Sequence, residues 1–65
     1  MNSNMHDYAD YEMVGNYVIR KHRSDPLQAM AMNMKTGAHR QFSGETCLPD
    51  ARRWAKYAYW REGML

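Results

Sequence analysis

The sequence predicts a small α+β domain in which a three-stranded antiparallel β-meander packs against one C-terminal helix. Its 65 residues allow a single domain with a modest core. Residues 17–42 carry strand and turn patterns, and residues 46–62 carry a helical pattern. Cys47 is the only cysteine, so no disulfide within the chain can staple the core. Stability must therefore come from packing, and a homodimer that shares this packing remains open.

Charge divides the chain into an acidic start and a basic body. Residues 1–12 hold Asp7, Asp10 and Glu12 without any Lys or Arg, whereas all nine basic residues follow them. The acidic segment could fold back onto the basic body or stay mobile, and the usual fraying of chain ends favours the mobile or partly ordered state. The sequence thus predicts an acidic tail over residues 1–12 and one domain over residues 13–65.

Residues 17–42 read as strands joined by turns. The run from Tyr17 is aromatic and β-branched, and Ser24-Asp25-Pro26 marks a turn. Residues 27–36 fit either a helix beginning at Pro26, which would make the protein mostly α, or a strand. The strand would lead through a turn at Gly37 into residues 39–42, and this hairpin pattern favours it. The helix propensities of Ala, Met, Leu and Gln favour the alternative.

The clearest helix is expected to begin at Thr46 or Cys47 and to run to about Glu62, before Gly63. One continuous face of this helix is expected to pack on the sheet, and it comprises Leu48, Ala51, Trp54, Ala55, Ala58 and Tyr59. The opposite face mixes basic and aromatic residues. Trp, Tyr and Arg dominate binding hot spots, so the predicted partner-binding residues are Arg53, Lys56, Tyr57 and Trp60. The competing interpretation is that Tyr8 and Tyr11 cover Tyr57 or Trp60.

Nucleic-acid binding is the alternative function. Basic residues interleaved with aromatic ones can grip phosphates and stack on bases, although a net charge of +2 is low for a committed DNA-binding protein. The sequence contains no nucleic-acid-binding motif. The residues that would form this basic sheet edge are Arg20, Lys21, Arg23, Lys35 and Arg40.

The sequence offers little chemistry for catalysis or metal binding. His6, His22, His39 and Cys47 are scattered and lack the close ligand pairs of structural zinc sites. A thiol at a helix start can be activated by a histidine, but no third orienting group accompanies Cys47, which favours an apolar or capping role. The phosphate-binding glycine loop and the nucleophile elbow are absent. We expect no enzyme activity, no metal and no cofactor.

The predicted function is a protein-interaction module that modulates or inhibits a larger protein. No signal-peptide pattern opens the sequence, and no stretch approaches the roughly 18 apolar residues that cross a membrane, so we expect a cytoplasmic protein without membrane contact. Small chains without catalytic motifs are often of this kind, and phage or mobile-element accessory proteins, including inhibitors of host defence, fit the description. The alternative is a small nucleic-acid-binding regulator.

Overall fold

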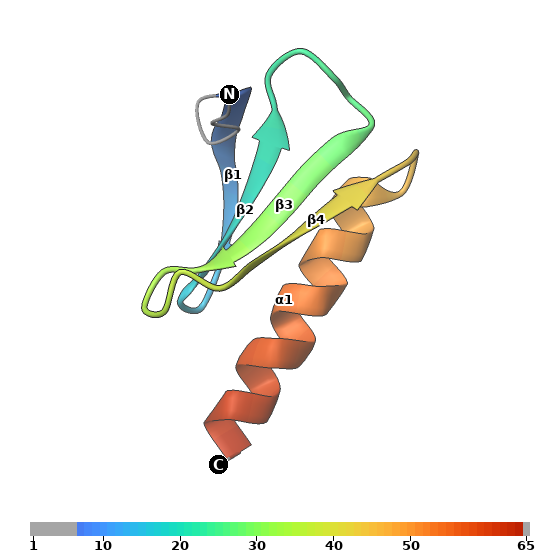
Figure 1. Cartoon of the computed structure of the whole chain (residues 1–65). Coiled ribbons are helices and arrows are strands. Elements are labelled where there is room, and N and C mark those ends of the chain that lie inside the picture. Colours follow the sequence, from blue (N-terminus) through green and yellow to red (C-terminus); the bar gives the residue numbers. More distant parts are fainter. Residues whose placement is uncertain (1–6, 65) are drawn as a thin grey trace.

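The computed structural model describes residues 7–64 and shows a sheet covered on one face by a single helix (Figure 1). The strands are β1 (Tyr8–Val14), β2 (Tyr17–His22), β3 (Gln28–Asn33) and β4 (His39–Ser43), and the helix is α1 (Cys47–Met64). The strands follow one another in chain order, and each pairs antiparallel with the next. The predicted α+β class and the C-terminal helix are confirmed.

The predicted strand count was wrong, because the sheet has four strands where three were expected. The additional strand is β1, which takes residues 8–12 from the segment expected to be an acidic tail. Its carboxylates find basic partners on the body: Asp10 pairs with Arg20 at 2.9 Å, and Glu12 pairs with Arg52 of α1 at 2.9 Å. Residues 1–6 of that segment lie outside the described residues.

A two-residue turn joins β1 to β2 and could have been recognised in the sequence. Gly15 and Asn16 occupy the turn, and Gly15 has a φ of +58° while Asn16 does not have a positive φ. A glycine at the first central position is typical of the type II′ turns that connect tight hairpins. The Gly15-Asn16 pair is therefore the local signal for the fourth strand.

The ambiguous residues 27–36 form strand β3 followed by a turn, so the mostly α alternative is wrong. The buried Asn33 organises this end of the sheet. Its side-chain oxygen accepts hydrogen bonds from the backbone N–H of Lys35 at 2.8 Å and from the side-chain amide of Asn16 at 3.0 Å. The turn after β3 is thereby tied to the turn after β1, a contact that a helix over residues 27–36 would not make.

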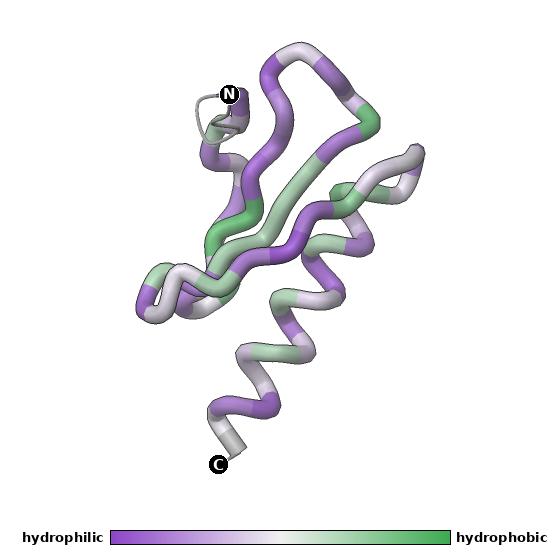
Figure 2. The backbone as a smooth tube through the Cα atoms, viewed as in Figure 1, coloured by the Kyte–Doolittle hydropathy of each residue, from purple (hydrophilic) through white to green (hydrophobic). Residues whose placement is uncertain are grey.

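The core lies between α1 and the two central strands. Ala29 and Ala31 of β3 face Ala51 and Ala55 of α1, and all four are fully buried together with Ile19. Figure 2 shows hydrophobic residues on the central strands, whereas the middle of β4 is hydrophilic. Small side chains on both surfaces let the helix approach the sheet closely.

Aromatic rings close the margins of this alanine contact. Trp54 lies edge-on to Tyr17, with ring centroids 5.7 Å apart, and it also contacts Phe42 at 6.1 Å. At the far end, the ring of Tyr59 covers the turn: a Cβ on Gly15 would lie 2.3 Å from one of its ring carbons. Tyr17 donates a hydrogen bond to Glu62 near the end of α1. The helix is thus fixed to the first hairpin along most of its length.

Replacing Gly15 with Ala should destabilise the protein more than replacing Gly37 with Ala. Both glycines have a positive φ, which alone costs about 1–2 kcal/mol for a residue with a Cβ. Only the Cβ at Gly15 would collide with a neighbour, the ring of Tyr59, so that variant should lose about a further 1–2 kcal/mol. Chemical denaturation of the two variants measures the difference. Equal losses in the two variants would contradict this prediction, because they would mean that a Cβ at Gly15 does not collide with the Tyr59 ring at a cost in stability.

The Tyr17→Phe variant should lose about 1–2 kcal/mol of unfolding free energy near neutral pH, because it removes the hydrogen bond to Glu62. That hydrogen bond, followed by burial, raises the pKa of Tyr17 above its ordinary value of 10.0. This contribution is therefore present below about pH 10 and is lost as the pH rises through the raised pKa. The stability gap between wild type and variant should narrow in alkaline solution. Urea denaturation of both proteins across pH 7–11 measures this difference in unfolding free energy. A difference that stays constant over this range would contradict the prediction.

Candidate interaction surface

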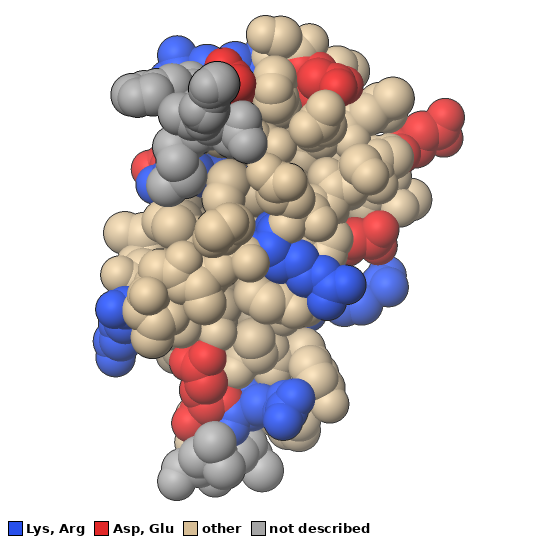
Figure 3. Space-filling view, in the orientation of Figure 1, with Lys and Arg blue, Asp and Glu red and all other residues tan. Residues whose placement is uncertain are grey.

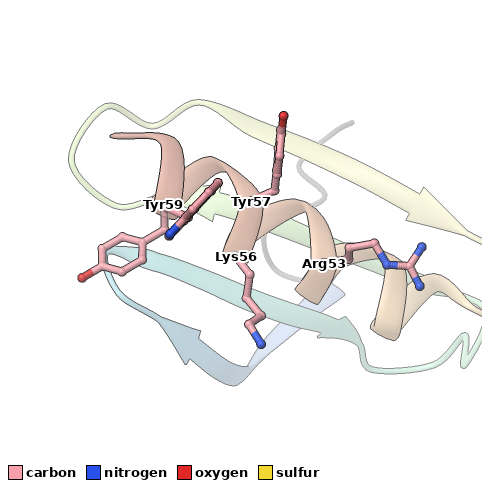
Figure 4. A pocket seen from close by; sticks show the side chains of 5 residues that line it. Arg53, Lys56, Tyr57 and Tyr59 are labelled. Atoms are coloured by element: carbon pink, nitrogen blue, oxygen red, sulfur yellow. The ribbon is translucent and has the colours of Figure 1, made fainter. Parts of the chain in front are cut away.

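The outward side of α1 carries a stripe of aromatic and basic side chains. Arg53, Lys56, Tyr57 and Trp60 follow the spacing i, i+3, i+4, i+7, which places them in one row along a helix. We call these four residues and the adjoining Tyr59 the aromatic-basic face. Together they line a shallow, open hollow of about 470 Å³. Figure 4 shows the side chains of Tyr57 and Lys56 pointing away from each other, at the two margins of this row.

Both ends of α1 are stabilised locally, so the stripe is presented by a well-formed helix. Thr46 precedes the first turn, and its hydroxyl donates to the Asp50 carboxylate at 2.8 Å. Asp50 in the first turn and Arg61 in the last turn have the signs that the helix dipole favours. With Ala51 and Ala55 packed on the sheet, the row Arg53, Lys56, Tyr57 and Trp60 points away from it.

The large side chains of this face are exposed to solvent. Trp60 is 62% exposed, Tyr57 is 58% exposed and Tyr59 is 47% exposed. A tryptophan with this exposure leaves a large apolar area in water, where it gains nothing from packing. This combination of exposed aromatic rings is the most unusual feature of the described surface.

The charges around these rings are positive. Arg53 and Lys56 form no ion pair with any acidic side chain among residues 7–64. The Arg61 guanidinium lies 5.6 Å from the centroid of the Tyr57 ring, a cation–π arrangement. Nearby carboxylates are engaged elsewhere, since Glu62 accepts from Tyr17 and Asp50 accepts from Thr46. The aromatic-basic face therefore presents apolar rings within a cationic rim.

Arg52 lies beside this face but is engaged by β1. Its guanidinium donates to Glu12 at 2.9 Å, and this hydrogen bond holds the pKa of Arg52 above its ordinary value. The pairing joins α1 to the first strand. Arg52 therefore has a structural partner, unlike Arg53 and Lys56 within the described part of the chain.

The structure brings the four predicted partner-binding residues together and adds Tyr59. The sequence placed Tyr59 on the sheet-packing face, and its ring does contact Gly15, yet nearly half of it remains exposed. Its position at the margin of the helical wheel was the available signal. Tyr59 thus belongs to both the packing contact and the exposed hollow.

The two tyrosines of β1 do not cover this surface. Tyr8 is buried on the sheet face away from α1, where its ring meets His22 edge-on at 5.0 Å and its hydroxyl donates to Gln28. Tyr11 is half-exposed, at the bulge of β1. The predicted alternative, in which these residues shield Tyr57 or Trp60, is therefore not what the structure shows.

The five residues proposed for nucleic-acid binding are dispersed. Arg20 points away from α1 and pairs with Asp10, whereas Arg40 lies on the helix side, 5.7 Å from the centroid of the Phe42 ring. Arg23 follows β2 and Lys35 follows β3, at opposite ends of the sheet, and Lys21 is exposed near the end of β2. On the face of the molecule that Figure 3 shows, the basic side chains form separate groups. The structure does not gather them into one patch.

Cys47 occupies the core at the start of α1. It is fully buried, and its thiol lies 3.6 Å from the carbonyl oxygen of Pro26, to which it donates. Among the described residues, no three His, Cys, Asp or Glu side chains lie close enough together to hold a metal ion. The geometry gives Cys47 a packing role at the helix start.

None of the helical residues within 7–64 forms a segment long and apolar enough to span a membrane. Comparison with protein-family models, curated proteins and solved structures finds no match. The chemistry of the aromatic-basic face is therefore the principal guide to function.

Proposed function

We propose that this protein is a non-enzymatic interaction module that docks onto a larger protein through the aromatic-basic face of α1 and thereby modulates or blocks it. The observation that carries this proposal is the exposed Trp60, flanked by Tyr57 on the outward side of a helix that already packs through its other side. Rows spaced i, i+3, i+4, i+7 are how amphipathic helices present anchors to a groove.

The energetics of the exposed rings support docking. Burying an aromatic side chain in a partner contributes about 2–3 kcal/mol, and this face offers Trp60, Tyr57 and part of Tyr59. The rings are attached to a helix held by the sheet, so little backbone ordering opposes binding. A short row of this kind can therefore supply much of the affinity of a specific complex.

The positive charges around the exposed rings indicate the chemistry of the partner surface. Arg53, Lys56 and Arg61 surround the rings with positive charge. Complementarity requires a partner surface that combines an apolar pocket with Asp or Glu side chains around it. The rings would supply most of the affinity, whereas the cations would speed association and fix orientation.

The alternative, a nucleic-acid-binding regulator, has weaker support. Its residues lie on both faces and at both ends of the sheet, and Arg20 and Arg40 already contact Asp10 and Phe42. A duplex or single strand would need several of them on one surface to gain from phosphate contacts. No second function is favoured by a specific observation.

Trp60→Ala should weaken the complex with the protein partner by about 30-fold, which corresponds to about 2 kcal/mol. The partner is first isolated on the tagged chain in the presence of nuclease, and its affinity is then measured by calorimetry. Leu27→Ala is the matched control, because Leu27 is also exposed, at 46%, but lies at the other end of the sheet from Trp60. That variant should bind like wild type.

Circular dichroism and thermal unfolding must first show that both variants fold. If folded Trp60→Ala binds like wild type, the docking proposal fails. If nuclease removes all bound material, the partner is a nucleic acid, and the proposal fails in favour of the alternative.

A further inference from the structure

The outer edge of β4 is open in the described structure. Within residues 7–64, β4 forms a ladder only with β3. The backbone N–H of Asn33 donates to the Ala38 carbonyl at 2.7 Å, which makes 33 and 38 a hydrogen-bonded pair. Hydrogen-bonded pairs alternate along an antiparallel ladder, so Arg40 and Phe42 direct their backbone groups toward β3.

The other three residues of β4 direct their backbone groups outward. By the same alternation, the N–H and C=O groups of His39, Gln41 and Ser43 face away from β3. All three residues are exposed, so α1 does not cover this edge. The edge thus offers a straight row of backbone donors and acceptors.

The opposite edge of the sheet, strand β1, is protected against pairing with another strand, unlike the edge at β4. Strand β1 has a bulge between Asp10 and Glu12, and both of these residues are charged. Bulges and charges are the usual means of preventing edge-to-edge pairing. Strand β4 has neither a bulge nor a proline, its register with β3 is unbroken, and Arg40 is its one formally charged residue.

We propose that β4 pairs antiparallel with β4 of a second copy, around a two-fold axis at Gln41, so that the two sheets become continuous. In this register, Gln41 lies opposite its own counterpart, His39 lies opposite Ser43, and Arg40 lies opposite Phe42. All outward groups are used, giving about six backbone hydrogen bonds between the copies.

The side chains favour this register over the neighbouring one centred on Arg40. A pairing centred on Arg40 would place two guanidinium groups opposite each other, which destabilises a strand pair. The pairing centred on Gln41 instead places each Arg40 opposite a Phe42 ring, the same cation–π combination that these residues make within one chain. The short sequence from His39 to Ser43 can therefore pair with itself without placing like charges directly opposite each other.

The helices leave room for this arrangement. Helix α1 packs mainly beneath the central strands, with Ala29 and Ala31 of β3 at the contact. In the dimer, the two β3 strands would be three strand spacings apart, about 14 Å. Packed helices need about 8–10 Å between axes, so the two α1 helices would not collide. Each aromatic-basic face would still point away from the sheet, so the pairing does not depend on the proposed docking function.

Sedimentation equilibrium of the wild-type chain, up to about millimolar concentration, should show reversible formation of a species with twice the chain mass of 7.7 kDa. Gln41→Pro should raise the dissociation constant at least about tenfold, because proline lacks the outward N–H while the ladder to β3 is untouched. Gln41→Thr keeps the N–H and should dimerise like wild type. A wild-type chain that stays monomeric throughout this range would overturn the proposal.

Cross-linking tests the register without relying on the proline variant. Gln41→Cys should form a disulfide-linked dimer under mild oxidation, because the two Cα atoms would be about 5.5 Å apart. His39→Cys is the matched control, since its counterpart would lie about 13 Å away. The native Cys47 is buried and should not compete. Equal cross-linking of the two variants, or none with Gln41→Cys, would overturn the register.

Discussion

The close contact between small residues on α1 and β3 is the constraint on which the rest of this structure depends. Ala51 and Ala55 meet Ala29 and Ala31 with no exposed surface left on any of them. Alanines bury little area, so the contact gains its stability from close approach and from the rings at its margins. The Trp54 ring packs against Tyr17 and Phe42 beside this contact, and the Tyr59 ring packs over Gly15 farther along the helix. A larger residue at any of the four alanine positions would lift the helix away from these rings.

Electrostatic pairing fixes the first strand onto this frame. Asp10 is held by Arg20 within the sheet, and Glu12 is held by Arg52 from the helix. These partly exposed pairs each contribute little free energy. They add to the Gly15 turn and to the backbone ladder with β2, which hold this strand in place. Arg53 and Lys56, by contrast, have no acidic partner among the described residues.

Much of this fold could be predicted from the sequence, and the errors have identifiable physical causes. The helix and the strands β2, β3 and β4 follow from periodicity and turn residues, and β3 formed despite helix-favouring Ala and Met because pairing on both sides outweighs local propensity. The bulge at Tyr11 broke the alternation that would have identified β1. The row Arg53, Lys56, Tyr57 and Trp60 followed from helical spacing, whereas Tyr59 depended on a tertiary contact with Gly15.

The helix inverts the usual distribution of side-chain size, and this inversion links the fold to its proposed role. The fully buried positions in the middle of its packing face are alanines, with Leu48 and Trp54 partly buried beside them. Its outward face carries Trp60, Tyr57 and part of Tyr59. A helix that served only to cover the sheet would gain more by directing its large apolar residues inward, where burial contributes about 25 cal/mol per Å². In this chain Trp60 and Tyr57 instead lie where packing on the sheet cannot bury them. The isolated domain therefore lacks the stabilisation that burying these rings would give. A partner surface that covers the rings would supply it, as the proposed docking requires.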